Sequence, residues 1–172
     1  MKDKFLNFIC VAFALAFSGP AEAVGSSLYQ HELIGQCFNA LDEARRPFRL
    51  SDGTDDENIR TSQAKFDKKS TWVIDKTSSH NFQWYLVEKG DRGYCYVLYI
   101  PFAAEVSGSR TGDNLTIRAK TQPSPGTKSY QMIFRKAKKS GNFVPYQCSE
   151  IRDQTKANTK PRVVDCLSVG KE

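Results

Sequence analysis

Cysteine and histidine are the residues in this sequence most able to do chemistry, and both are few: five cysteines and two histidines in 172 residues. A nucleophilic cysteine needs a histidine base within hydrogen-bonding reach. His31 lies six residues before Cys37, on nearly the opposite face of the helix expected there, which leaves His80 as the base for Cys37 or Cys95. A small hydrolase that uses His80 is therefore one hypothesis.

Metal binding has less support in the sequence. Zinc sites use closely spaced cysteines and histidines, and neither pattern occurs here. The segment SDGTDDE, residues 51–57, lacks the alternating ligands and the placed glycine of an EF-hand loop. Its carboxylates are Asp52, Asp55, Asp56 and Glu57. We expect a solvated acidic loop at this place and no metal or cofactor.

Serine and carboxylate chemistry also lack a motif. Ser109 is the serine closest to a glycine-flanked arrangement, but the sequence Gly-x-Ser-x-Gly does not occur. Paired carboxylates of the glycosidase kind meet in space and not in sequence. Glu88 and Glu105, near predicted strand ends, leave a carboxylate hydrolase open, although exposed residues at the rim of a sheet are the more ordinary explanation.

The N-terminus has the three parts of a secretory signal. Lys2 and Lys4 precede an apolar run from Phe5 to Phe17, and the small-residue sequence AEA ends at Ala23. We expect residues 1–23, including Cys10, to be removed and residues 24–172 to form a single domain. No later stretch is apolar enough to cross a membrane. The expected location is the periplasm or the outside of the cell.

Removal of the signal leaves four cysteines: Cys37, Cys95, Cys148 and Cys166. An even number in an exported chain predicts two disulfides. Three connectivities are possible, and the placement of two cysteines in buried elements favours Cys37–Cys95. The remaining pair, Cys148–Cys166, joins the last two predicted strands. This pairing leaves no free thiol for catalysis.

The pattern of apolar residues predicts one helix followed by strands. Spacings of three, four and five, with a capping box at Ser27 and a stop at Pro47, indicate a helix from Ser27 to Arg45. Phe48–Ser70 is polar, and we expect a surface loop with a short helix over 58–66. Strands are expected at Thr71–Lys76, Phe82–Glu88, Tyr94–Val106, Leu115–Thr121, Tyr130–Arg135, Phe143–Ile151 and Arg162–Val169.

Short, turn-rich breaks between these strands favour hairpins. The predicted fold class is therefore α+β: one N-terminal helix packed on a curved antiparallel meander, or partial barrel, of six or seven strands with two disulfides. The run from Tyr94 to Val106 is apolar on both faces. We expect it to be a central strand, with the helix covering one of its faces.

Positive charge gives the main indication of a partner. The formal net charge is +6, and the segment RKAKKSG concentrates basic residues in one turn. In a meander, this turn and the loop SGSRTGDN emerge at the same end, which predicts a basic surface of Arg110, Arg135, Lys136, Lys138 and Lys139. Neighbouring segments add Arg118, Lys120 and Lys128. The ordinary alternative is a solvated turn that keeps the protein soluble.

The functional prediction is a non-enzymatic, exported interaction protein that inhibits or neutralises an envelope-acting hydrolase or toxin through exposed loops. Its expected partner is an acidic exported protein, or else an anionic glycan or lipid, whereas nucleic acid is not expected. The alternative is a carrier that binds an apolar ligand inside the curved sheet. The aromatic residues for such a cavity are Phe82, Trp84, Tyr85, Tyr94, Tyr96, Tyr99 and Phe102.

Overall fold

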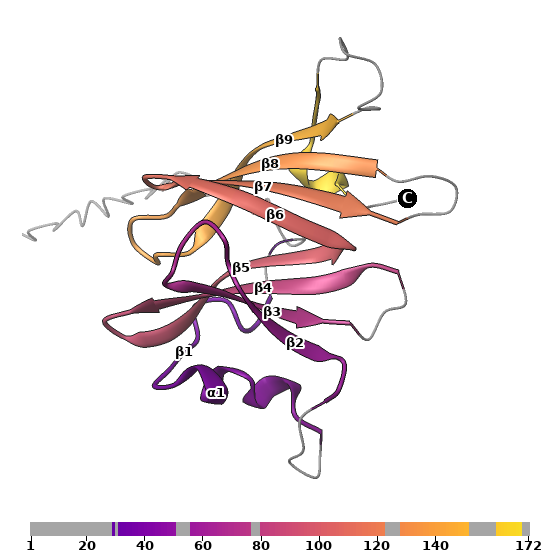
Figure 1. Cartoon of the computed structure of the whole chain (residues 1–172). Coiled ribbons are helices and arrows are strands. Elements are labelled where there is room, and N and C mark those ends of the chain that lie inside the picture. The colour runs from indigo at the N-terminus through magenta and orange to yellow at the C-terminus, as the bar shows by residue number, and fades with distance from the viewer. Residues whose placement is uncertain are drawn as a thin grey trace, which may run out of the picture.

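The computed structural model describes residues 29, 31–50, 56–76, 80–122, 128–151 and 161–169. These residues form two antiparallel sheets of five strands each, stacked as two layers (Figure 1). The first sheet has the order β1-β5-β4-β3-β2, with β1 (Cys37–Phe38), β2 (Ile59–Gln63), β3 (Ser70–Asp75), β4 (Phe82–Gly90) and β5 (Gly93–Ala103). The second sheet has the order β10-β9-β8-β7-β6, with β6 (Glu105–Thr111), β7 (Asn114–Thr121), β8 (Lys128–Lys136), β9 (Phe143–Ile151) and β10 (Arg162–Val164).

Each strand from β2 to β10 pairs with the next along the chain, apart from the step between β5 and β6. At this step the chain leaves the first sheet and enters the second. Ala104 is the connecting residue, and its N–H donates to the carbonyl of Lys120 at 2.8 Å. Neighbouring strands within each sheet are thus antiparallel, but the expected single curved meander, or partial barrel, is wrong, because the chain forms two separate sheets.

The core between the two sheets follows from alternation along the strands. Strand β7 buries Leu115, Ile117 and Ala119, whereas Arg118 and Lys120 are exposed. The buried side chains of β7 pack with those of β8, its neighbour in the second sheet, and with those of β5 in the first sheet. The core between the sheets includes Tyr29, Leu98, Ile100, Phe102, Leu115, Ile117, Tyr130, Met132, Phe134 and Cys148.

The opposite face of the first sheet has its own apolar cluster. Residues 31–50, named here the cover segment, include the single α-helix of the described residues, α1 (Leu41–Ala44), and the 3-10 turn η1 (Arg46–Phe48). This segment lies below the first sheet in Figure 1. The cluster consists of Leu33, Ala44, Ile59, Val73, Tyr85, Val87 and Tyr96, with Phe48 packed against it. The first sheet is therefore buried on both faces, as predicted for the strand that contains Cys95.

The predicted α+β class is wrong, because 59% of the described residues are in strands and 8% are helical. The expected helix Ser27–Arg45 is reduced to four residues, and its first residues lie outside the described ranges. Leu33 and Ala44 are buried as the spacing implies, but the chain between them makes turns and the short strand β1. Strand pairing with β5 competes with helix formation here and prevails.

The pairing of β1 with β5 depends on a glycine. Gly93 has a φ of +90°, and a Cβ atom at this residue would lie 2.2 Å from the carbonyl oxygen of Phe38. Only glycine allows this approach of two backbones. Gly93 therefore allows β1, within the cover segment, to pair with β5 of the first sheet.

Two further expectations for strands need correction. Residues 58–66 form β2 and a following turn instead of a short helix, because Ile59 to Gln63 pair with Asp75 to Thr71. The expected strand Tyr94–Val106 is two strands, β5 and β6, separated at Ala104. The described residues therefore form ten strands where six or seven were expected for the chain. Five of the remaining predicted strands lie within a few residues of β3, β4, β7, β8 and β9. The expected strand Arg162–Val169 is instead the three-residue β10 followed by a 3-10 turn.

Both predicted disulfides are confirmed. Cys37 is bonded to Cys95 and Cys148 to Cys166, the latter at the start of the 3-10 turn η2 (Cys166–Ser168). The reason given for the first pair is only partly right. Cys37 is on strand β1, directly opposite Cys95 on β5, and not on a helix. Each bridge joins a terminal part of the described chain to one of the sheets.

Candidate functional site

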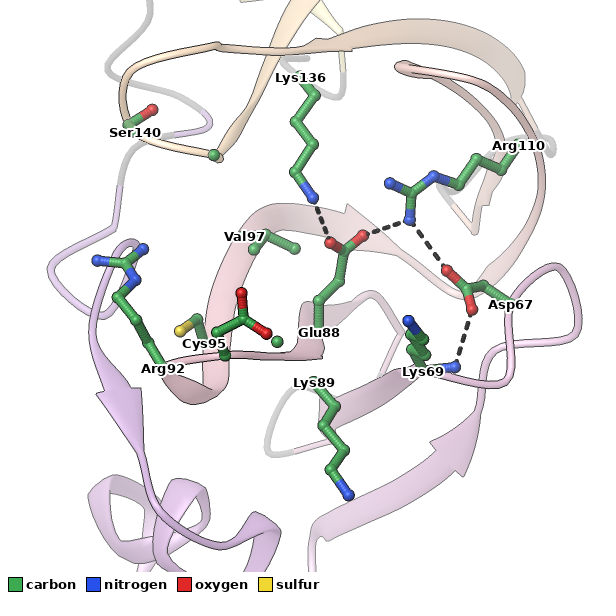
Figure 2. Close-up of a pocket in the computed structure, with 13 residues that line it drawn as sticks. Asp67, Lys69, Glu88, Lys89, Arg92, Cys95, Val97, Arg110, Lys136 and Ser140 are labelled. Carbon is green, nitrogen blue, oxygen red and sulfur yellow. Dashed lines mark hydrogen bonds and ion pairs between the residues drawn. The ribbon is translucent and has the colours of Figure 1, made fainter.

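A cleft lies where the two sheets meet at one end of the molecule (Figure 2). Its volume is ≈ 620 Å³. The turn between β4 and β5, the turn between β8 and β9, and the loop between β2 and β3 surround it. Its lining residues are Asp67, Lys69, Glu88, Lys89, Gly90, Asp91, Arg92, Cys95, Val97, Arg110, Lys136, Ser140 and Gly141.

Glu88 is the centre of an ion-pair network inside this cleft. Its Oε1 atom accepts from Nη1 of Arg110 at 2.8 Å, and its Oε2 atom accepts from Nζ of Lys136 at 2.6 Å. The same Nη1 atom of Arg110 also donates to Oδ2 of Asp67 at 3.0 Å. Figure 2 shows the two basic side chains reaching from the second sheet to Glu88 on the first. The network therefore ties the two sheets together.

The network is partly shielded from water. The side chain of Glu88 is 11% exposed, and those of Arg110 and Lys136 are 22% and 29% exposed. The ring of Phe143 lies beneath both cations, 5.4 Å from Cζ of Arg110 and 5.5 Å from Nζ of Lys136. Partial burial strengthens such charge-assisted contacts and holds the side chains in one arrangement. The charged side chains at the floor of the cleft are therefore bound to one another.

The remaining charges of the cleft are less constrained. Lys69 and Arg92 are exposed and form no ion pair within the described ranges, whereas Lys89 lies over the ring of Tyr94 at 5.7 Å. The lining has five basic and three acidic side chains, and only the exposed Asp91 among the acids lacks an ion pair there. The rim of the cleft thus presents an excess of positive charge.

The predicted basic residues divide into three groups. Arg110 and Lys136 come together as expected, but both are bound to carboxylates of the fold. Lys138 and Lys139 lie on the exposed turn between β8 and β9, beside the cleft, without an ion pair in the described residues. Arg135 belongs to another surface, because its guanidinium carbon lies 3.3 Å from the ring centroid of Tyr146.

The segment 107–114, expected to be a loop, is most of β6 followed by a tight turn at Gly112 and Asp113. This turn nevertheless lies at the end of the molecule where it was expected. The N–H of Lys136 donates to the carbonyl of Asp113 at 2.9 Å. The two chain reversals that were predicted to share an end are therefore adjacent.

The other candidate chemical groups are not assembled into the cleft. Cys95 lines it, but as half of a disulfide. His31 packs on Tyr85 and Tyr99, with ring centroids 5.1 Å and 4.8 Å away, and His80 is not among the lining residues. Oε2 of Glu105 lies 3.0 Å from Nζ of Lys120. Glu105 is five residues before Arg110, the residue of β6 that binds Glu88. Glu88 and Glu105 therefore do not form a pair.

Sequence reasoning missed the part that Asp67 plays in this site. Asp67 lies in a polar stretch interpreted as a surface loop, and nothing in its local sequence separates it from other exposed acidic residues. Its position follows from the turn of residues 64–69, where the N–H of Ala64 bonds to the carbonyl of Ser70 at 2.9 Å. This turn brings Asp67 to β6 in the other sheet.

No cluster of metal-ligating side chains occurs in the described part of the chain. Asp52 and Asp55 of the acidic segment lie outside it, and Asp56 uses Oδ1 to accept the N–H of Asn58 at 2.8 Å. None of the helices among the described residues is long and apolar enough to span a membrane.

The aromatic residues considered for an apolar cavity are mostly packed in the fold. Tyr85, Tyr96 and Tyr99 lie under the cover segment, and burial raises the pKa of each hydroxyl above its ordinary value. Phe102 belongs to the core between the sheets. The cleft itself is lined mainly by charged side chains, which is not the usual lining of a site for an apolar ligand.

Comparison with known protein families, curated proteins and solved structures finds no match to this chain.

Proposed function

We propose that this protein is an exported binding protein whose cleft and adjoining turn capture an acidic segment of another envelope or secreted protein. The observation that carries this proposal is the division of charges at the cleft. Asp67 and Glu88 are bound to cations of the fold, while Lys138 and Lys139 beside the cleft have no carboxylate partner in the described residues. An acidic partner supplies the missing counter-charges.

The arrangement suits recognition by preorganised contacts. The Glu88 network holds Arg110 and Lys136 in place, and the exposed turn of residues 138–140 carries two lysines between the paired strands β8 and β9. Basic residues fixed before binding lose less conformational entropy when a partner arrives. Their charge also increases the association rate, an effect that decreases with salt.

Inhibition is the specific form of binding that we favour. Many hydrolases carry paired carboxylates in an open cleft. A protruding basic turn that enters such a cleft neutralises these carboxylates and blocks access of the substrate. Lys138 and Lys139 occupy the tip of a short turn, between β8 and β9, that is suitable for insertion.

The two alternatives have less support from the geometry. A carrier of apolar ligands requires a predominantly apolar cavity, whereas the cleft with the Glu88 network is lined mainly by charged side chains. A hydrolase that uses His80 lacks that residue in the cleft, and Asp67 and Glu88 share one arginine nitrogen. The two disulfides are typical of oxidising compartments, which supports a periplasmic or secreted location.

The test is capture of acidic proteins from an envelope extract at low and high salt. We expect the double variant with Lys138→Ser and Lys139→Ser to retain its thermal stability and to lose most capture at low salt. Association rates for a hepta-glutamate peptide, measured by surface plasmon resonance, should decrease about tenfold. Equal capture by the wild type and this variant in every condition would remove the turn from the proposed function.

The matched control has the same change in net charge elsewhere on the molecule. Arg60 on β2 and Arg162 on β10 are exposed and do not line the cleft. A double variant with Arg60→Ser and Arg162→Ser should capture the same proteins as the wild type. Loss of capture in both double variants would indicate that net charge alone attracts the partner.

A further inference from the structure

Strand β6 is the least protected edge of the two sheets. The four edge strands are β1, β2, β6 and β10, with two, five, seven and three residues. Proteins usually protect sheet edges with short strands, prolines, lysines or bulges, because an open edge pairs readily with another chain. The sequence of β6, EVSGSRT, contains no proline or lysine, and its pairing with β7 has no bulge.

The register of β6 shows which of its main-chain groups face outward. Thr111 and Asn114 close a two-residue turn, so Thr111, Ser109 and Ser107 direct their N–H and C=O groups to β7. Val106 and Gly108 alternate with them and direct theirs away from the sheet. No main-chain hydrogen bond recorded among the described residues uses these outward groups. Val106 and Gly108 thus offer two donors and two acceptors at this edge.

An apolar groove lies directly beside this edge, between β6 of the second sheet and β2 and β3 of the first. Its volume is ≈ 210 Å³, which accommodates one large apolar side chain. The edge groove is lined by Ser62, Gln63, Lys65, Phe66, Trp72, Ile74, Trp84, Val106, Ser107 and Gly108. Its aromatic side is firmly held, because Nε1 of Trp84 donates to the carbonyl of Ala103 at 2.7 Å and the two tryptophan rings are in edge contact at 5.8 Å.

Gly108 allows β6 to lie in close contact with the Phe66 ring of the edge groove. A Cβ atom at this residue would lie 2.8 Å from Cδ1 of Ile117 and 3.1 Å from Cε1 of Phe66. The absence of a side chain therefore lets the Phe66 ring rest against β6. A strand placed along β6 would direct alternate side chains towards Phe66 and the edge groove, and the others towards solvent.

The outer side of the same edge favours acidic residues. Ser107 and Ser109 are small and exposed, and Arg118 lies opposite Ser107 on β7. Arg118 is exposed and forms no ion pair in the described part of the chain. Neighbouring strands are about 4.8 Å apart, so the arginine and a glutamate of an added strand can meet across the short serine. Acidic residues at the outward positions therefore complement this face.

We propose that β6 binds an extended segment of another exported protein by strand addition. The segment alternates apolar residues, one of which fills the edge groove, with acidic residues that face Arg118. Its main chain pairs with the outward groups of Val106 and Gly108, which makes it the sixth strand of the second sheet. Main-chain bonds supply affinity in this mode of binding, and the side-chain pockets supply selectivity.

The experiment uses an acetylated seven-residue peptide with glutamate at alternate positions, leucine at the centre and threonine elsewhere. Trp72 and Trp84 are the two tryptophans of the chain, and both line the edge groove, so their fluorescence reports its occupancy. We expect a saturable change in emission. Methylation of alternate peptide nitrogens should weaken binding at least tenfold, as should replacement of glutamate by lysine.

A charge reversal at Arg118 tests whether the acidic side chains of the peptide face this residue, without a change in the core. Arg118→Glu should weaken binding of the acidic peptide at least fivefold and improve binding of the lysine peptide. The double variant with Lys138→Ser and Lys139→Ser should bind the acidic peptide as the wild type does, which separates this site from the cleft. Undiminished binding of the methylated peptide, or no emission change with any of the three peptides, overturns the proposal. A stable dimer through β6, observed by light scattering, also overturns it by assigning the edge to a second copy.

Discussion

The first sheet is buried on both faces, whereas the second sheet is buried on one face and open to solvent on the other. Tyr85, Val87 and Tyr96 of the first sheet face the cover segment, and Leu98 and Ile100 face the core between the sheets. On the second sheet, Val144 and Tyr146 remain 45% and 54% exposed. The two layers thus have the same number of strands but different surroundings.

This difference separates the stabilising part of the molecule from its binding surfaces. The first sheet uses its outer face to hold the cover segment. The second sheet supplies the edge strand β6, the turn with Lys138 and Lys139, and the Arg110 and Lys136 side chains of the cleft. Substitutions under the cover segment should therefore change stability. Substitutions on the exposed parts of the second sheet should change binding.

The largest expected effect is the loss of a disulfide, and it should differ between the two sheets. Cys37–Cys95 closes a separation of 58 residues and Cys148–Cys166 one of 18. Because a longer closed loop restricts the unfolded chain more, removing the first bridge by alanine at both cysteines should cost about 4 kcal/mol. Removing the second should cost about 3 kcal/mol. Chemical denaturation of the two double variants measures both values.

The order of the two losses is the informative part of this experiment. If removal of Cys148–Cys166 costs more than removal of Cys37–Cys95, the cover segment contributes less to stability than the comparison of the sheets implies. The wild type with both disulfides intact is the reference.

The second prediction concerns alkaline pH. Burial raises the pKa of Tyr85 and Tyr96 well above 10, so both stay neutral in the folded protein while they ionise above about pH 10 in the unfolded chain. Their contribution is therefore complete below pH 10 and decreases as the pH increases further. At pH 11 the loss should be about 1.4 kcal/mol for each tyrosine, or about 3 kcal/mol for both. Urea denaturation at pH 8 and pH 11 measures it.

A variant with phenylalanine at both positions provides the control. It should have lower stability at pH 8, because the hydroxyl hydrogen bonds are lost, but a smaller decrease between pH 8 and pH 11. An equal decrease in the variant and the wild type would place the alkaline sensitivity outside the cover segment.

The strands of this fold are predictable because their apolar residues alternate. Leu115, Ile117 and Ala119 show the pattern clearly, and the structure buries these three residues. The apolar spacing of residues 28–44 predicts a long helix, and this prediction is wrong. The same spacing also fits turns and a short strand packed against a sheet. No local signal predicts that Ala104 transfers the chain from one sheet to the other.

The candidate site is predictable only in part, for a similar reason. Turn composition and the meander topology bring Arg110 and Lys136 to one end. Their carboxylate partners come from the other sheet, and the contact between the sheets is a tertiary property that sequence spacing does not contain. For this reason the sequence suggests five free cations, whereas the structure leaves only Lys138 and Lys139 of these unpaired in the described residues. Arg110 and Lys136 bind carboxylates of the fold, and Arg135 packs on Tyr146.

The third prediction tests the junction between the sheets. Glu88→Gln leaves Arg110 and Lys136 partly buried without their main counter-charge, which should cost about 2 kcal/mol of unfolding free energy. Glu105→Gln is the matched control, because the Glu105–Lys120 pair is 66% and 51% exposed and should contribute less than about 0.5 kcal/mol. Equal effects of the two substitutions, measured by thermal denaturation, would mean that the junction does not hold the sheets together.

The smallest expected effects come from removing single tyrosine hydroxyls. One such hydroxyl binds the cover segment, and another binds the C-terminal part of the described chain. The Tyr96 hydroxyl donates to the carbonyl of Ala44 in the cover segment, and this contact is buried. The Tyr29 hydroxyl donates to the carbonyl of Cys166 at 3.0 Å, in a partly buried contact. Tyr96→Phe leaves a buried carbonyl without its partner and should cost about 1.5 kcal/mol. Tyr29→Phe, where water has better access to the carbonyl, should cost about 1 kcal/mol or less.

Hydrogen exchange adds a local measure, because Tyr96→Phe should increase exchange in residues 41–48 and leave β7 and β8 unchanged. Increased exchange throughout both sheets would show that the cover segment and the sheets unfold as one unit, and the contrast between the two layers would then be one of exposure alone.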